Sequence, residues 1–437
     1  MTAQSPDVVV IGSGVFGSAI AFELSKAGYR TVVVDKNPAP GYGSTSNSSG
    51  IIRFSYSTRE GVAMSYEGLG YWQDWADYIG VVDDVDLATF IRCGTVHLKD
   101  EQDEQWRVCV SHYETVGVPY EDWDLDTLLD RFPIFDPHSF RPPRRPDDPR
   151  FWDEPSGSIL GAIFTPDSGY IGAPQMAARN LADAAIAHGA TFRQREQVVE
   201  ILRGPDRVRG VALAGGERID APIVVNAAGP YSSTINRMAG VDDDMNIETR
   251  ALRHEVHHVP SPASFDFEHQ GAHIADADTG VYFRPEVGNH ILVGGMDAEC
   301  DEKVWVDDPD DFPDRVTRDE WDAYVLRLAR RIPDLPIPGR PSGVVDLYDV
   351  SDDWIPIYDR SSLDGFYMAI GTSGNQFKNA PVAGYCMTRL IEAVENGLDH
   401  DADPLSVTQR YRGNELDMGF YSRLREINPE SSFSVNG

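Results

Sequence analysis

Three glycines near the start of the chain, Gly12, Gly14 and Gly17, form a Gly-x-Gly-x-x-Gly pattern that could bind a pyrophosphate. In such a pattern the first glycine permits a tight turn, the second lets the backbone approach the phosphates, and the third lets a helix pack on a strand. The N-terminus of that helix stabilises the phosphate charge. Asp35 would accept hydrogen bonds from a ribose and would repel a 2′-phosphate, which argues against NADP. The alternative is a βαβ unit with incidental glycines.

The segments around these glycines follow the order strand, helix, strand. Residues 7–11 and 31–34 are short apolar runs typical of buried strands, and the second run ends in Asp35. The stretch between Gly17 and Gly28 has apolar residues at helical spacing, and Gly28 is predicted to end the helix. The first 35 residues therefore predict a nucleotide-binding βαβ unit.

Beyond Asp35 the chain departs from a nicotinamide dehydrogenase, which should supply a third strand at once. Residues 41–50 instead form a loop of small hydroxyl side chains, and residues 66–78 form an aromatic-rich helical stretch that is predicted to pack in the core. The apolar runs 222–226 and 365–371 are predicted to return to the nucleotide-binding sheet. Which of FAD and NAD is bound therefore depends on the rest of the chain.

The central part of the chain predicts a second sheet. Residues 246–340 contain alternating strand-like stretches, notably 281–283 and 290–295, which suit a mostly antiparallel sheet. We therefore expect an α/β fold with a Rossmann-like domain and a second, mostly antiparallel β-sheet domain.

Composition and charge limit the function further. The chain has 437 residues, of which 41% are hydrophobic and 25% charged, as in globular proteins. Its net charge is −32, which disfavours nucleic-acid binding because phosphates require a basic surface. The acidity predicts either an ordinary solvated acidic surface or adaptation to a salt-rich cytoplasm.

The sequence predicts a cytoplasmic protein without a membrane span. Its four cysteines, Cys93, Cys109, Cys300 and Cys386, form no CxxC pair, so neither a zinc site nor a disulfide framework is indicated. Residues 1–7 are too short for a signal peptide, and no stretch approaches the roughly 20 apolar residues that cross a bilayer.

The hydroxyl-rich loop after Asp35, the strand 222–226 with its following Gly-Pro, and the glycine-rich segment 371–378 together resemble the FAD-dependent D-amino acid oxidase superfamily. The resemblance is to sarcosine oxidase and to dimethylglycine and sarcosine dehydrogenases. It spans residues 7 to about 397, with specific motifs in five short segments.

This resemblance implies the domain organisation and the cofactor. The expected FAD-binding domain is discontinuous, the substrate domain lies between its parts, and a C-terminal tail follows. In that order they comprise residues 1–90, 155–245 and 343–399, then 91–154 and 246–342, then 400–437. The FAD-binding residues it implies are Gly12, Gly14, Val15, Phe16, Gly17, Asp35, Lys36, Ser44, Thr45, Ser46, Ser49, Gly50, Ile51, Val198, Ala228, Gly229, Gly371, Gly374, Asn375, Gln376, Phe377 and Lys378.

Two basic residues are candidates to bind a substrate carboxylate. Arg53 lies in a segment, residues 51–56, similar to the one whose arginine grips the carboxylate in sarcosine oxidase, and a guanidinium can form two parallel hydrogen bonds with a carboxylate. The alternative for Arg53 is a surface salt bridge. Lys378 matches the lysine that ends the family's glycine-rich segment. Gln376 stands where the family has glycine, so the course of this loop differs.

Three further positions match active-site residues of the family. His254 resembles a histidine of the dimethylglycine dehydrogenase type, and Tyr348 resembles a tyrosine of sarcosine oxidase. Met296 stands near the position of a substrate-facing histidine, and Leu292 near that of the lysine assigned to oxygen activation. His254 and Tyr348 could equally be ordinary packed residues.

The positions of covalent flavin attachment carry other residues in this chain. Dehydrogenases of the family link FAD through a histidine where this chain has Asn47, and sarcosine oxidase uses a cysteine where it has Asp346. We therefore expect non-covalent FAD.

The resemblance implies oxidation of the C–N bond of an amino acid, expected to be N-methylated, with hydride transfer to flavin and O₂ or another acceptor taking the electrons. The alternatives are oxidation of a primary amino acid or a 2-hydroxy acid, and an electron-relay subunit of a larger dehydrogenase. Arg53 and Lys378, and the lack of a cysteine cluster for iron and sulfur, argue against the relay.

Overall fold

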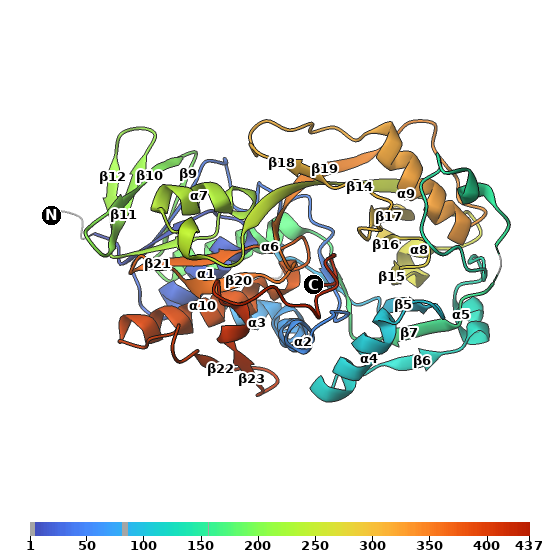
Figure 1. The fold of residues 1–437 in the computed structure, drawn as a ribbon, viewed down its shortest axis with the longest axis horizontal. Helices are drawn as coiled ribbons and strands as arrows, with labels where there is room; N and C mark the ends of the chain where they lie inside the picture. Colours follow the sequence, from blue (N-terminus) through green and yellow to red (C-terminus); the bar gives the residue numbers. More distant parts are fainter. Residues whose placement is uncertain (1–4, 81–85, 156) are drawn as a thin grey trace.

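A computed structural model describes residues 5–80, 86–155 and 157–437 of the chain. It has two lobes, one built on a six-stranded sheet and the other on a nine-stranded sheet (Figure 1). The last residues of the chain lie in the middle of the molecule, between the lobes (Figure 1). This is the α/β architecture that the sequence predicted.

The expected βαβ unit forms the centre of the first lobe. It consists of β1 (Val8–Ile11), α1 (Val15–Lys26) and β2 (Thr31–Asp35). β1 pairs in parallel with β2 and with β13 (Ile223–Asn226), so the late apolar run does return to this sheet. Alternate residues of β1 enter apolar cores on opposite faces of the sheet, which explains its unbroken apolar sequence.

The third parallel strand, which does not follow Asp35 directly, comes much later in the chain. β9 (Thr191–Gln194) pairs in parallel with β2, and residues 36–190 intervene. The sheet order is β20-β21-β13-β1-β2-β9, where β21 (Phe366–Ile370) pairs in parallel with β13 and β20 (Ile357–Arg360) is an antiparallel edge strand.

Helices cover one face of this sheet and a small sheet covers the other. On the first face, α1 packs against α6 (Pro174–Ala187) and α10 (Ala380–Glu395). The apolar core of the second face joins the six-stranded sheet to the small antiparallel sheet β10-β11-β12 and to α7. The bounds of these elements are β10 (Val198–Arg203), β11 (Val208–Leu213), β12 (Arg218–Asp220) and α7 (Ser232–Ala239).

The aromatic stretch forms two consecutive helices in the core of the first lobe. They are α2 (Arg59–Gln73) and α3 (Trp75–Ile79). The ring of Trp72 stacks on that of Trp75, with centroids 4.5 Å apart, and its indole nitrogen donates to the carbonyl of Lys378 at 2.8 Å. These helices therefore position a predicted site residue as well as filling the core.

The second lobe is built on the expected, mostly antiparallel sheet, and among the pairings of its described strands only β15–β5 is parallel. Its strands, in spatial order, are β18 (Val304–Val306), β14 (Thr249–Pro260), β17 (His290–Gly295), β16 (Val281–Glu286), β15 (His273–Asp276), β5 (Thr95–Lys99), β7 (Gly161–Thr165) and β6 (Glu121–Trp123), and β19 (Gly343–Ser351) also pairs with β14. The amphipathic helix α9 (Arg318–Arg331) packs against it, although the sequence analysis identified no helix there.

Shorter elements complete the described chain. They are β3 (Ile51–Ile52), β4 (Phe90–Ile91), β8 (Gly169–Ile171), α4 (Gln105–Val116), α5 (Leu125–Arg131), α8 (Phe267–Gln270), β22 (Ser406–Thr408) and β23 (Glu415–Asp417). No helix in the described ranges is long and apolar enough to cross a membrane.

The strand assignments bear on the expected domain boundaries. β7 and β19 lie in the nine-stranded sheet, whereas the expected boundaries at 155 and 343 placed both in the FAD-binding domain. We propose that the boundaries fall after β7 and after β19.

A buried ion cluster in the second lobe gives a test of this architecture. Arg331 is fully buried and contacts two buried acids, Asp276 at 2.8 Å and Asp278 at 2.9 Å. We expect Arg331→Met to destabilise the protein by about 3–5 kcal/mol, because it leaves two carboxylates buried without a cation. The measurement is the shift of the urea unfolding transition.

The neighbouring Arg330 provides the control. It is partly exposed, donates to the carbonyl of Asp153 at 3.0 Å and lies over the rings of Phe140 and Phe151, but it has no buried carboxylate partner in the described ranges, so we expect Arg330→Met to cost only about 1–2 kcal/mol. Equal effects of the two substitutions would contradict the importance of the buried cluster.

Candidate functional site

A single long cleft runs from the carboxyl ends of the parallel strands in the first lobe to the sheet of the second lobe. Its lining includes the segments that follow β1, β2, β13 and β21, which is where open α/β sheets bind their ligands. The other wall includes residues of β14, β15, β16 and β19. Both lobes therefore build the site.

The glycine turn has the shape that a pyrophosphate requires. Gly12 has a φ of +103°, and a side chain there would collide with the carbonyl of Ala227. A side chain at Gly17 would collide with the carbonyl of Gly12, so Gly17 allows α1 to pack closely on the turn. Gly14 caps α1 without a side chain, and the next amide, Val15 N–H, donates to Thr45 Oγ1 at 3.1 Å. These residues fit the phosphates of FAD.

Asp35 ties the glycine turn to the end of β2. Its Oδ2 accepts hydrogen bonds from the amide and the hydroxyl of Ser13, at 2.7 and 2.8 Å, and its Oδ1 accepts from the amide of Asn37 at 2.8 Å. Each carboxylate oxygen can accept more than one hydrogen bond. Because Asp35 also lines the cleft, it fits the expected ribose partner.

A contact between the lobes closes the cleft beside Asp35. Lys36 forms an ion pair with Asp310 and lies 3.7 Å above the centre of the Tyr231 ring. The Tyr231 hydroxyl donates to the carbonyl of Pro309 at 3.0 Å. Val198 also lines the cleft.

The glycine-rich segment 371–378 forms the opposite end of the cleft. The carbonyl of Asn375 accepts hydrogen bonds from Tyr56 Oη and from Lys378 Nζ, the latter at 2.6 Å. Gln376, at the position where the resemblance places glycine, is held inside the protein by hydrogen bonds of its side-chain amide with Asn375 and Asn379, both at 2.6 Å. Burial and the nearby charge of Arg53 place the pKa of Lys378 well below its usual range.

Arg53 is buried rather than part of a surface salt bridge. Only 7% of its surface is exposed, and its guanidinium donates to the carbonyls of Ser55 and Val435. Within the described ranges, neither Arg53 nor Lys378 has a carboxylate partner. Arg53 Cζ and Lys378 Nζ lie 5.1 and 5.0 Å from the centre of the Tyr56 ring. The donors of both side chains are bonded to neutral groups, so the cleft holds two buried basic residues for which an anionic group would supply the counter-ion.

The three further candidates, His254, Tyr348 and Met296, lie together at the wall of the second lobe. His254 stacks on Tyr348 with ring centroids 4.2 Å apart, and Met296 lines the cleft with them. His254 Nε2 lies 3.2 Å from a carboxylate oxygen of Asp297. Burial raises the pKa of Tyr348 well above its usual range, so its hydroxyl stays protonated.

His273 lines the same cleft, and sequence reasoning missed it. The side chain is 1% exposed, its Nδ1 lies 3.2 Å from Thr95 Oγ1, and its Nε2 has no hydrogen-bond partner within the described ranges. Burial, then the charges of Arg53 and Lys378, hold its pKa well below the usual range, so the imidazole is neutral. A lone histidine in an apolar strand gives no sequence signal that its side chain lines a cleft.

Asn47 and Asp346, which stand where the resemblance places residues for covalent flavin attachment, lie next to each other. Asn47 Nδ2 donates to Asp346 Oδ2 at 2.7 Å, and Ser44 Oγ lies 3.1 Å from Asp346 Oδ1. Both sequence segments therefore reach the same place in the cleft.

All the predicted cofactor and substrate residues line the cleft except Gly17, Ser46 and Gly371. Gly17 packs under the turn, Ser46 donates to the carbonyl of Gly43, and Gly371 donates to Asp349. Leu292, by contrast, is buried in a small apolar cluster at the strand pair β16–β17.

Residues 7–390 match the family model described as DAO, FAD dependent oxidoreductase. The chain is 23% identical to glycine oxidase of Geobacillus kaustophilus over 92% of its length and 97% of the relative. It is 23% identical to the mitochondrial pyruvate dehydrogenase phosphatase regulatory subunit of Mus musculus over 75% of its length, which spans only 34% of that relative. Mitochondrial sarcosine dehydrogenase of Mus musculus is 28% identical over 49% of this chain and 23% of its own length.

The fold is similar to that of a solved dehydrogenase. The crystal structure of L-proline dehydrogenase from P. horikoshii superposes with a TM-score of 0.75 over 97% of this chain and all of that chain, at 20% identity.

Asp349, on the floor of the cleft, gives a prediction about pH. It is fully buried and accepts hydrogen bonds from Ser232 Oγ and the Gly371 amide, both at 2.7 Å. Burial raises its pKa to about 7. Because the folded state binds this proton more tightly than the unfolded chain does, the carboxyl stabilises the fold most below about pH 4, and this contribution is lost as the pH rises through about 7.

The variant Asp349→Asn keeps the shape of the protonated acid and removes the titration. We expect the free energy of unfolding of the variant, minus that of the natural protein, to increase by up to about 4 kcal/mol between pH 4 and pH 8. The measurement is the melting temperature of both proteins at several pH values. A difference that stays constant with pH would refute the assignment.

Proposed function

Because this chain belongs to the DAO family of FAD-dependent oxidoreductases, we propose that it oxidises the C–N bond of an N-methylated amino acid. The observation that supports an amino acid is the pair of buried bases, Arg53 and Lys378, which have no carboxylate partner within the described ranges. A substrate carboxylate would supply that partner and would be fixed in position and angle by the guanidinium.

The residues of the first lobe would hold FAD. The Gly12 turn and the N-terminus of α1 would bind its phosphates, Asp35 its ribose, and segment 371–378 its ring. When bound, FAD supplies the acceptor for a hydride from the substrate carbon.

The protein's own part is to bind and orient the substrate and to control its protonation. Arg53 and Lys378 hold the carboxylate, while His254, Tyr348 and Met296 form the facing wall. The positive charge of Arg53 near the bound amine lowers the amine's pKa, which favours the neutral form whose lone pair assists hydride loss. The resulting imine would hydrolyse to a smaller amine and an aldehyde or oxo acid.

Two observations bear on the class of amino acid. The match to sarcosine dehydrogenase and the apolar Met296 beside the stacked His254–Tyr348 pair favour an N-methyl group. The match to glycine oxidase over almost its whole length favours a primary amino acid, which is the second candidate. Apolar Leu292 stands where the resemblance places an oxygen-activating lysine, so this position does not favour O₂ over another acceptor. Our proposal therefore includes both O₂ and another electron carrier.

We further propose that FAD is bound without a covalent link, because Asn47 and Asp346 bond to each other where relatives carry the attachment residues. We expect precipitation with acid to release all the yellow colour into the supernatant. Colour that stays with the precipitated protein would refute this proposal.

The role of Arg53 is tested by substitution. We expect Arg53→Gln to raise the KM for the amino acid at least about tenfold, because it removes charge-assisted hydrogen bonds to the carboxylate. Steady-state kinetics with N-methylated and primary amino acids give the measurement, and the visible spectrum shows that FAD remains bound.

The matched control is Arg59→Gln. Arg59 is exposed, and in the part of the chain that the structure describes its only ion pair is a surface one with Glu60, so its loss should leave the KM unchanged. Unchanged kinetics of Arg53→Gln would remove the main support for an amino acid substrate.

A further inference from the structure

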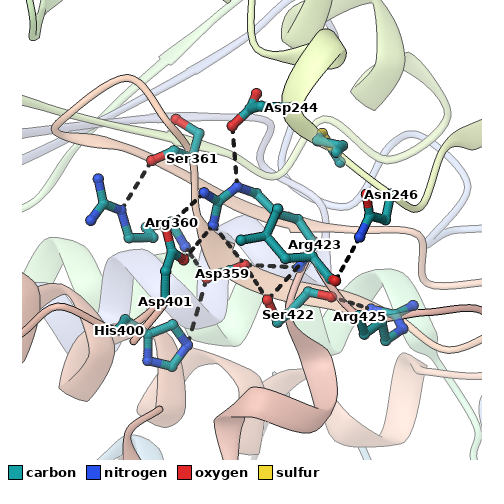
Figure 2. A network of polar contacts seen from close by, with 12 residues as sticks. Asp244, Asn246, Asp359, Arg360, Ser361, His400, Asp401, Ser422, Arg423 and Arg425 are labelled. Atoms are coloured by element: carbon teal, nitrogen blue, oxygen red, sulfur yellow. Dashed lines mark hydrogen bonds and ion pairs between the residues drawn. The ribbon is translucent and has the colours of Figure 1, made fainter. Parts of the chain in front are cut away.

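The last part of the chain is fastened to the first lobe by a buried ion network (Figure 2). Arg423 makes a two-point contact with Asp401, at 2.7 and 2.9 Å, and lies 3.2 Å from Asp359 on β20. The amide of Arg423 also donates to Asp359 at 2.8 Å, and His400 lies 3.6 Å from the other oxygen of that carboxylate. The Arg423 and Asp359 side chains are almost completely buried, so this attachment is shielded from solvent.

A second arginine extends the attachment toward the cleft. Arg425 contacts both carboxylate oxygens of Asp353, at 2.7 and 2.9 Å, and donates to the carbonyl of Ile355 at 2.7 Å. Ser431 Oγ then donates to the carbonyl of Asp353 at 2.6 Å. Residues 422–437, which we call the strap, are therefore held at several points before they reach the cleft.

The end of the strap lies on the proposed substrate site. The amide of Ser57 donates to the carbonyl of Asn436 at 2.9 Å, and the guanidinium of Arg53 donates to the carbonyl of Val435. Val435 and Asn436 both line the cleft, and only 7% of each is exposed.

The side chain of Val435 belongs to the same wall as a candidate active-site residue. It packs in a small apolar cluster with Leu252, Val350 and Trp354, and Tyr348 packs against that cluster. One residue of the strap thus contacts the substrate site in two ways, with its carbonyl on Arg53 and its side chain beside Tyr348.

We propose that the strap is a fixed wall of the substrate cavity, in which the Val435 side chain limits the size of the substrate and the Val435 carbonyl orients Arg53. A guanidinium has five N–H donors, so the bonds to Ser55 and Val435 leave donors for a carboxylate. These bonds also fix the plane in which the remaining donors point. The limit on substrate size rests on the proposed function. The role of the strap as a wall that closes the cleft to solvent does not.

The first test uses the binding of simple carboxylic acids, which needs no turnover. Acetate, butyrate and hexanoate are titrated into the FAD-loaded protein, and the change in the visible flavin spectrum gives each Kd. We expect Val435→Ala to improve the binding of hexanoate relative to acetate about tenfold, because it removes two methyl groups from the wall. The matched control is Phe433→Asn, because the Phe433 side chain is 41% exposed on the same strap and its φ of 51° suits asparagine.

The second test removes residues 431–437 and keeps the Arg423 and Arg425 attachments. We expect acetate to bind more weakly, because Arg53 loses the carbonyl that orients it, and the hexanoate preference to increase. We also expect iodide to quench the fluorescence of bound FAD several-fold more effectively than in the full chain, whatever the substrate. Melting temperature and FAD content show that the shortened chain folds.

The outcomes separate the two proposals. An unchanged ratio of hexanoate to acetate affinity in Val435→Ala overturns the size limit, and unchanged iodide quenching in the shortened chain overturns the closure by the strap. If no carboxylate binds to the FAD-loaded full chain while iodide quenching rises on shortening, the proposed amino acid substrate fails and the strap as a wall of the cleft stands.

Discussion

The burial of two bases beside each other, Arg53 and Lys378, is the constraint on which the site depends. Removing such groups from water is costly unless their donors are satisfied. Carbonyls from three separate segments accept their hydrogen bonds: Ser55 after β3, Asn375 in the glycine-rich segment, and Val435 in the strap. Trp72 of α2 holds the Lys378 carbonyl in turn. The elements around the cleft therefore share the task of keeping two buried bases ready for an anion.

The local basicity of the cleft contrasts with the acidity of the whole chain. A net charge of −32 repels anions, although physiological salt screens surface charges beyond a Debye length of about 8 Å. Buried charges are screened much less than surface charges, so the Arg53 guanidinium dominates the potential inside the cleft. Burial, and then this charge, hold the pKa of His273 well below its usual range and keep the imidazole neutral. The proposed discrimination between substrates therefore depends on the cleft rather than on the surface charge.

The sequence predicted the parts of this site that follow local rules. The glycine turn, Asp35 and the buried strands obey constraints of backbone geometry and burial, and the structure confirms these elements. Arg53 and Lys378 came from resemblance, and only the fold shows that both reach the ring of Tyr56. His273 and Val435 gave no signal, because their positions depend on strand pairing and on a strap whose attachments lie far away in sequence. Helix α9 does carry an amphipathic pattern, so a helix at Arg318–Arg331 is predictable from the sequence.

The most direct test of the account is an anaerobic titration of the FAD-loaded protein with N-methylated amino acids and with their methyl esters, followed by visible absorption. If Arg53 and Lys378 bind the substrate carboxylate, an N-methylated amino acid bleaches the flavin, whereas its ester, which presents no carboxylate, bleaches it at least about tenfold less readily. Bleaching by the ester as readily as by the acid, or a flavin that no amino acid bleaches, would contradict it.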